Sequence, residues 1–174
     1  MAIQYEFYRN PNKPKGKSVS VSISCATFVP KPFTPFEFEP QISKEEMERK
    51  QAYLKSCITT RKIDLSMHDS STSFLEGAFA RGDRRLGKVI ETAVKKGCRF
   101  DGWDECFELE KWLEAFEAAG IDPAFYANRA FGLDEVLPWD IIDCGVSKEF
   151  MRRERDKAYG ERTTPSCREK CSGC

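Results

Sequence analysis

Residues 18–25 read SVSVSISC, a strict alternation of serine with an aliphatic or thiol side chain. Because successive side chains of a β-strand point to opposite faces, this period of two predicts a strand with two different faces. One face carries the serines, and the other carries Val19, Val21, Ile23 and Cys25. The aliphatic face requires a hydrophobic layer such as packed helices. The serine face suits solvent or a polar barrel interior, and the pattern alone favours solvent.

A proline-rich stretch follows this strand. Residues 27–36 read TFVPKPFTPF, and four prolines fall between positions 30 and 40. Proline removes a backbone donor and restricts the residue before it, so this stretch is predicted as a stiff, extended loop. Such a loop can hold backbone groups against a ligand at little entropic cost. The alternative is a surface connection whose aromatic side chains pack on the body of the protein.

The rest of the chain is predicted to be mostly helical. Ser43 and Glu46 form a capping box that opens a helix, and residues 62–68 alternate as a second strand. About five more helices follow, the last capped by Ser147. Their predicted buried stripes include Met47, Leu54, Cys57 and Ile58 in the first helix, and Leu86, Val89, Ile90, Ala93 and Val94 in a later one. Gly97 and Gly120 are predicted helix ends, and Asp122-Pro123 a helix start. Two strands do not make a sheet that stands alone, so the N-terminal half is predicted to be incomplete.

Composition and charge exclude several classes of protein. The chain has 174 residues, 40% of them hydrophobic, and a formal net charge of zero. This length supports one domain with a real core, and the neutral charge does not indicate a nucleic-acid or membrane partner. No apolar run approaches the roughly 18–20 residues of a membrane span. The first residues lack the basic and apolar regions of a signal peptide, so the eight cysteines indicate a reducing compartment, the cytoplasm.

Three of the cysteines lie in the last eight residues, CREKCSGC at 167–174. Thiolates of Cys167, Cys171 and Cys174 on one short segment can converge on a soft metal. They can bind zinc with a fourth ligand from elsewhere, or an iron–sulfur cluster with an outside ligand. A redox dithiol and an inert terminus are the alternatives. The other five cysteines are interpreted as ordinary buried thiols.

Two further groups are candidates for chemistry. His68, the only histidine, is followed by Asp69 and can act in acid–base catalysis. A histidine that makes a structural hydrogen bond at a strand end is the commoner case, so the catalytic residues stay unknown. The charged run at 81–85 is interpreted as a helix cap at Asp83 with local ion pairs.

The loop at 27–36 resembles the F/Y-x-P-x-P-x-T-P loop found late in radical SAM barrels. Methylthiotransferase-type enzymes carry glycine where this chain has Phe33. The sequence resembles more closely the uncharacterised family of B12-binding radical SAM proteins, in which STFVPKPxTPF runs into a helix. Further segments resemble that family: RGDRRLG at 81–87, FDGW at 100–103, LDEVLPWD at 133–140, CGVSKEF at 144–150 and TTPSCR at 163–168. The resemblance covers nearly everything after residue 17.

This resemblance implies an α/β, mostly helical fold. Residues 1–69 would be the end of an incomplete (β/α) radical SAM-type barrel, 70–160 an α-helical extension, and 161–174 a Cys-rich tail. The family places a cobalamin-binding domain and a barrel with a C-x₃-C-x₂-C cluster motif before these segments. That missing N-terminal part is the implied partner, and the serines at 18–24 would point into its barrel.

The resemblance also implies a function and cofactors. The chain would be a C-terminal fragment or subunit of a cobalamin-dependent-type radical SAM enzyme, inactive without the missing part. In the parent enzyme a [4Fe-4S] cluster cleaves S-adenosylmethionine to a 5′-deoxyadenosyl radical, and the backbone at Thr27, Phe28 and Val29 would lie near the adenine. The alternatives are a non-enzymatic, metal-binding helical interaction module and a small thiol-redox protein.

Overall fold

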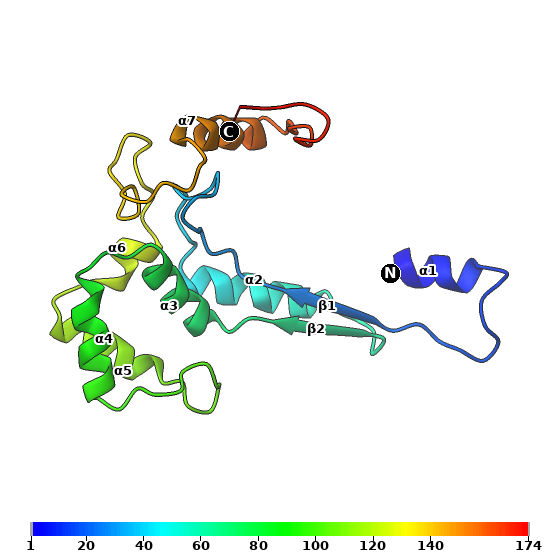
Figure 1. The fold of residues 1–174 in the computed structure, drawn as a ribbon. Helices are drawn as coiled ribbons and strands as arrows, with labels where there is room; N and C mark the ends of the chain where they lie inside the picture. Colours follow the sequence, from blue (N-terminus) through cyan, green and yellow to red (C-terminus); the bar gives the residue numbers. More distant parts are fainter. Residues whose placement is uncertain (1, 174) are drawn as a thin grey trace. The chain divides into compact units, whose positions relative to one another are not determined.

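The structure is a computed structural model, and it describes residues 2–173 (Figure 1). Within that range the chain is α/β and mostly helical, as the sequence predicts. Its helices are α1 (Ala2–Arg9), α2 (Lys44–Ser56), α3 (Ser70–Ala80), α4 (Leu86–Lys95), α5 (Leu109–Ala118), α6 (Pro123–Ala127) and α7 (Lys148–Tyr159). Its strands are β1 (Val21–Cys25) and β2 (Ile63–Met67).

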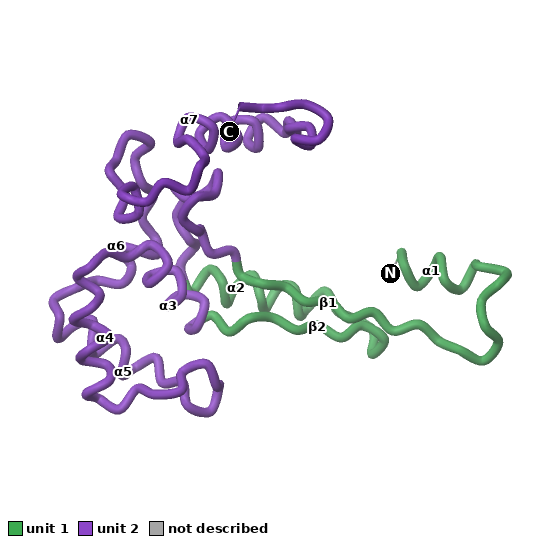
Figure 2. Tube along the Cα trace, in the orientation of Figure 1, with its two compact units in different colours: residues 1–27, 44–70 green, residues 28–43, 71–174 purple. Residues whose placement is uncertain are grey.

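The chain divides into two compact units (Figure 2). Unit 1 contains residues 1–27 and 44–70, and unit 2 contains residues 28–43 and 71–174. The proline-rich loop therefore makes its contacts within unit 2, although it connects two stretches of unit 1. Among residues 2–173, no helix has both the length and the apolar character needed to cross a membrane.

Unit 1 is built on a parallel pair of strands. β1 and β2 pair from Val21 opposite Ile63 to Cys25 opposite Met67, with α2 between them in the sequence. This is the βαβ arrangement that parallel strands require. β1 is shorter than predicted because residues 18–20 precede the start of the ladder.

Both strands of this sheet have one unpaired edge. Val21 N–H donates to the Lys62 carbonyl at 2.8 Å, and Cys25 C=O accepts from His68 N–H at 3.4 Å. Since alternate residues of a strand direct their backbone groups to opposite edges, Ser22 and Ser24 direct theirs away from β2. Within the described chain no third strand meets either edge.

The predicted faces of unit 1 are only partly covered. Asp64 and Ser66 are exposed on one side of β2, in agreement with the predicted alternation. On α2, Met47 is buried as predicted, but Leu54 is exposed, and so is Cys57 directly after the helix. The prediction that Leu54 and Cys57 are buried is therefore wrong. Among the described residues, no apolar layer covers the face of unit 1 on which they lie.

Unit 2 contains two apolar clusters. The larger one joins α3, α4, α5 and α6, with Val89, Ala115 and Phe116 at its centre. The α4 stripe is narrower than predicted, since Leu86, Val89 and Ala93 are buried while Ile90 and Val94 stay exposed. The smaller cluster consists of Phe38, Phe131, Leu137 and Trp139, with half-buried Phe33 against it.

The predicted ends of these helices are confirmed in four places. Gly97 and Gly120 follow α4 and α5 with φ of 93° and 67°, the left-handed backbone that glycine accepts readily. The Asp122 side chain accepts from Ala124 N–H at 2.8 Å and caps α6. The Ser147 side chain accepts from Phe150 N–H at 3.2 Å and caps α7. Local side-chain chemistry therefore sets these boundaries.

Candidate functional site

The residues expected near a cofactor follow directly after β1. Thr27 ends its stretch of unit 1, and Phe28 and Val29 begin the loop in unit 2. Phe28 is 55% exposed, whereas Val29 is half-buried and Pro30 is buried. The Phe28 ring makes an edge-to-face contact with Phe36, with centroids 6.2 Å apart. The loop that leaves the carboxyl end of β1 therefore exposes Phe28 and becomes buried two residues later, at Pro30.

Phe33 gives this loop its unusual backbone. Its φ is 60°, a left-handed conformation that costs a non-glycine residue about 1–2 kcal/mol. Two contacts offset this cost: the Phe33 N–H donates to Glu37 Oε2 at 2.9 Å, and the ring packs against the smaller apolar cluster. Glycine accepts this conformation without strain, so Phe33 keeps its ring at the cost of a strained backbone.

Glu37 holds the middle of the loop. It is only 3% exposed, and its Oε2 also accepts from the Trp139 indole N–H at 2.7 Å. The neighbouring Phe38 is buried in the smaller cluster, where its carbonyl accepts from Phe131 N–H at 2.9 Å. Buried hydrogen bonds of this kind specify one arrangement of the loop, because breaking them leaves donors without partners.

The end of the loop is fastened by the last two helices of unit 2. Arg155 Nε on α7 donates to Glu39 Oε1 at 2.6 Å, and both side chains are largely buried. Gln41 N–H donates to the Ala127 carbonyl of α6 at 2.9 Å, and Asn128 Nδ2 donates to the Gln41 carbonyl at 3.0 Å. We call residues 127–159 the brace, since this segment contacts the loop from position 33 to position 42.

A matched pair of substitutions tests the backbone of the loop. We expect Phe33→Gly to be more stable than Phe33→Ala by about 1 kcal/mol, because both lose the ring but only glycine relieves the left-handed strain. At Phe36, half-buried in the same loop without a positive φ, the order should reverse. Urea denaturation of the four variants measures both differences. Equal stability of the two Phe33 variants would show that the left-handed backbone is absent.

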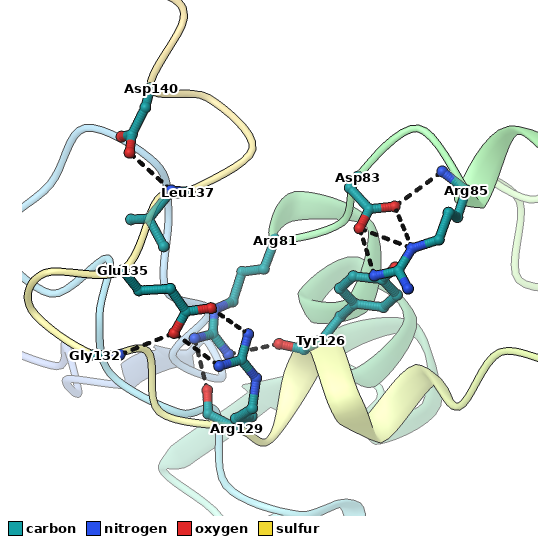
Figure 3. A network of polar contacts seen from close by, with 9 residues as sticks. All are labelled: Arg81, Asp83, Arg85, Tyr126, Arg129, Gly132, Glu135, Leu137 and Asp140. Atoms are coloured by element: carbon teal, nitrogen blue, oxygen red, sulfur yellow. Dashed lines mark hydrogen bonds and ion pairs between the residues drawn. The ribbon is translucent and has the colours of Figure 1, made fainter.

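Arg81 is the most deeply buried charge of unit 2 (Figure 3). It is 0% exposed, and its guanidinium donates to the carbonyls of Tyr126, Ala127 and Arg129 at 2.6, 2.8 and 2.7 Å. It also lies over the Phe131 ring, 4.0 Å from the centroid. Burial lowers the pKa of Arg81 to about 10. Arg81 thus satisfies carbonyls at the end of α6, where the brace begins.

Two ion pairs flank Arg81. Asp83 accepts from the Arg85 side chain at 2.7 Å, and this hydrogen bond lowers the pKa of Asp83 to about 2. Arg129 donates twice to Glu135, at 2.8 and 2.9 Å, which lowers the pKa of Glu135 (Figure 3). The ion pairing predicted for residues 81–85 is confirmed at Asp83 and Arg85, but α4 begins later, at Leu86. These contacts are structural, since each charge is engaged by a neighbour.

The two acid–base candidates are exposed on unit 1. His68 follows β2, and its backbone is engaged on both sides: the N–H donates to Cys25 C=O, and the carbonyl accepts from Gln51 Nε2 at 2.8 Å. The side chains of His68 and Asp69 are both exposed. The catalytic role stays a prediction, and the backbone bonds of His68 alone account for its place at the strand end.

The Cys-rich tail folds back along α7 (Figure 1). Arg153 Nη2 donates to the carbonyls of Ser172 and Gly173 at 2.7 and 3.1 Å, and Lys157 Nζ donates to Thr164 Oγ1 at 2.9 Å. Cys167 and Cys171 are exposed in the segment between these anchors. Cys174 lies outside the described residues. Among residues 2–173, no three side chains of His, Cys, Asp or Glu gather closely enough to hold a metal ion.

Sequence reasoning did not single out the residues that hold the loop. Glu37 stands in the run FEFEP at 36–40, where acidic and aromatic residues alternate within an otherwise apolar loop. That alternation was the available signal, because an acid between buried aromatics requires donors. The partners Trp139 and Arg155 lie more than a hundred positions further along. No local pattern identifies pairs so far apart.

Comparison with known proteins does not assign the chain to a family. No family model matches it, and neither a curated protein nor a solved structure does so. Its function is therefore inferred from the open sheet, the braced loop and the tail.

Proposed function

We propose that this chain is the C-terminal part of a cobalamin-binding radical SAM enzyme, and that its two strands complete a barrel formed by other polypeptide. The observation that carries the proposal is the parallel β1–β2 pair with both edges unpaired within the described chain. Parallel sheets occur almost only with both faces covered and with neighbouring strands. A two-stranded sheet lacks the buried area to be stable by itself.

The exposed groups of unit 1 match what a larger barrel would cover. Ile23 on β1 is 39% exposed, and Leu54 on α2 and Cys57 directly after it are exposed as well. The backbone groups of Ser22 and Ser24 face an open edge, ready to pair with another strand. In a completed barrel the serine side chains would line the polar interior, and the aliphatic face would pack on helices.

The braced loop supports the same proposal. It leaves the carboxyl end of a parallel strand, where open α/β sheets place their ligands. Hydrogen bonds of Phe33, Glu37 and Glu39 fix the backbone of its later part. We propose that the backbone of Thr27, Phe28 and Val29 contacts the adenine of S-adenosylmethionine, which supplies the radical precursor when bound. Val29 precedes Pro30, which restricts its backbone, so little entropy is lost there on binding.

The residues of this chain fit part of the cofactor set. Backbone groups next to β1 suit adenine, which is recognised through hydrogen bonds and shape. An iron–sulfur cluster is held by several converging thiolates. The described residues of unit 1 contain two cysteines, Cys25 and Cys57, which are too few. We therefore assign the radical-generating cluster and the cobalamin to the partner polypeptide.

Complementation tests this function. The chain is co-expressed with the N-terminal part of a B12-binding radical SAM protein. That part is truncated just before the strand that leads into its own proline-rich loop. We expect the two parts to co-purify, and to convert S-adenosylmethionine to 5′-deoxyadenosine under anaerobic reduction only when both are present. Failure to form a complex would contradict the proposal.

A matched pair of variants makes this test specific. Ser22→Pro removes an N–H that points away from β2, so the lone chain should keep its fold while the complex is lost. Ser22→Ala keeps the N–H and should form the complex normally. If both variants assemble equally well, the β1 edge does not receive a strand.

The tail supports a second candidate function, a metal-binding helical module. The supporting observation is the pair of anchors on α7, which hold the tail segment of Cys167 and Cys171 in a closed loop. Metal analysis of the purified chain tests it. We expect one zinc or iron per chain, lost in Cys171→Ser and kept in Cys57→Ser, and a metal-free wild type would exclude this candidate.

A further inference from the structure

Unit 2 contains a cavity between the loop and the brace. Its volume is about 160 Å³, and its walls include Phe33 and Glu37 from the loop and Trp139, Val146, Lys148 and Met151 from the brace. Engineered apolar cavities of about 150 Å³ hold a benzene molecule, so this one has room for a ligand of about five to eight non-hydrogen atoms. Aromatic and aliphatic walls with a few polar groups are typical of small-molecule sites.

Glu37 is the feature that points to a ligand. Its side chain is 97% buried, and both of its described hydrogen bonds, from Phe33 N–H and Trp139 Nε1, end on Oε2. Among residues 2–173, no cationic side chain pairs with Glu37 and no protein donor meets Oε1, yet Oε1 is not one of the fully enclosed polar atoms that lack a partner. Oε1 therefore keeps some accessible surface. A carboxylate in such a poorly solvated place gains from a charged partner, because desolvation of an isolated charge is costly. One oxygen of this carboxylate is therefore available to a cationic donor in the cavity.

The other charges of the cavity leave it acidic. Lys148 forms an ion pair with Asp140, so these two charges neutralise each other. Asp143 lies at the wall and accepts from Gly145 N–H at 2.8 Å, without a cationic partner among the described residues. In the described chain, no three side chains of His, Cys, Asp or Glu are placed to hold a metal ion together. A cation with an extended apolar body fits this arrangement better than a bare ion.

We propose that this cavity binds a small organic ammonium ion. Its N–H groups would donate to Glu37 Oε1, and the faces of Trp139 and Phe33 would add cation–π attraction. Its alkyl part would pack against Val146 and Met151. This site does not depend on the radical SAM proposal, because all of its residues belong to unit 2 and none lies at the open sheet edges.

Titration of the full chain with three probes of similar length tests the site. n-Butylammonium, n-butanol and butyrate are added while the Trp139 indole N–H signal is followed by NMR, assigned through Trp139→Phe. We expect saturable one-to-one binding of n-butylammonium, about 10- to 100-fold tighter than n-butanol, as for a charge-assisted hydrogen bond against a neutral one. Butyrate should not bind.

Substitutions then locate the charge. Glu37→Gln keeps an oxygen acceptor for Trp139 and should abolish the preference for n-butylammonium over n-butanol. Asp134→Asn removes an exposed carboxylate outside the cavity and should leave the preference unchanged. Equal binding of n-butylammonium and n-butanol to the wild type, or binding of neither, would overturn the proposal. That comparison needs no variant, so it decides the question even if Glu37→Gln does not fold.

Discussion

Replacing Arg81 with methionine should lower the free energy of unfolding by about 3–5 kcal/mol. The substitution leaves the carbonyls of Tyr126 and Arg129 without this donor in a buried place, and the Ala127 carbonyl keeps only its bond from Gln41 N–H. Methionine has a similar length, so the loss reports the hydrogen bonds rather than a cavity. Urea denaturation monitored by circular dichroism measures the change.

Arg84 provides the matched control for this experiment. It has the same charge three positions further along, but its side chain is exposed. We expect Arg84→Met to change the stability by no more than about 0.5 kcal/mol. Similar losses at both positions would mean that Arg81 is not the buried clamp described here.

Phe38→Ala should also cost about 3–5 kcal/mol, because it removes a buried ring from the small cluster that joins the loop to the brace. The surrounding Phe131, Leu137 and Trp139 come from a different part of the chain and cannot close fully over the gap. We expect the Trp139 indole N–H signal to shift or broaden as the loop loosens. Urea denaturation and NMR give the two readouts.

Phe28 is the corresponding control within the same loop. Its ring is mostly exposed and contacts Phe36 at the edge, so Phe28→Ala should cost no more than about 1 kcal/mol. A larger loss at Phe28 than at Phe38 would place the anchor of the loop at its exposed start, contrary to the structure.

Local chemistry made much of the fold predictable. The Asp122 and Ser147 caps each depend on residues two or three positions away, and the period of two at 62–68 depends on one strand. Such signals act within a few residues, so they can be recognised in the sequence.

The predicted strand at 18–25 is longer than β1 because strand length depends on a distant partner. A strand exists only where a partner pairs with it, and β2 begins at Ile63, opposite Val21.

The candidate site was less predictable because its contacts are distant in sequence. The resemblance of the loop points to Thr27, Phe28 and Val29, but no sequence pattern points to Trp139 and Arg155, which fix the loop. The charged run at 81–85 predicts ion pairs, whereas Arg81 bonds to carbonyls rather than to an acid. A run of charged residues predicts that its arginines form ion pairs. Only the packed structure shows that Arg81 is buried.

Backbone amide exchange in the lone chain tests the incomplete sheet most directly. Ser22 and Ser24 on β1, and Leu65 and Met67 on β2, direct their N–H groups to open edges, so these amides should exchange about as fast as unstructured ones. Their neighbours Ile23, Cys25, Asp64 and Ser66 face the partner strand and should exchange more slowly. Exchange of Ser22 and Ser24 as slow as that of Ile23 and Cys25 in the monomeric chain would show that β1 already has two partners and would contradict the account.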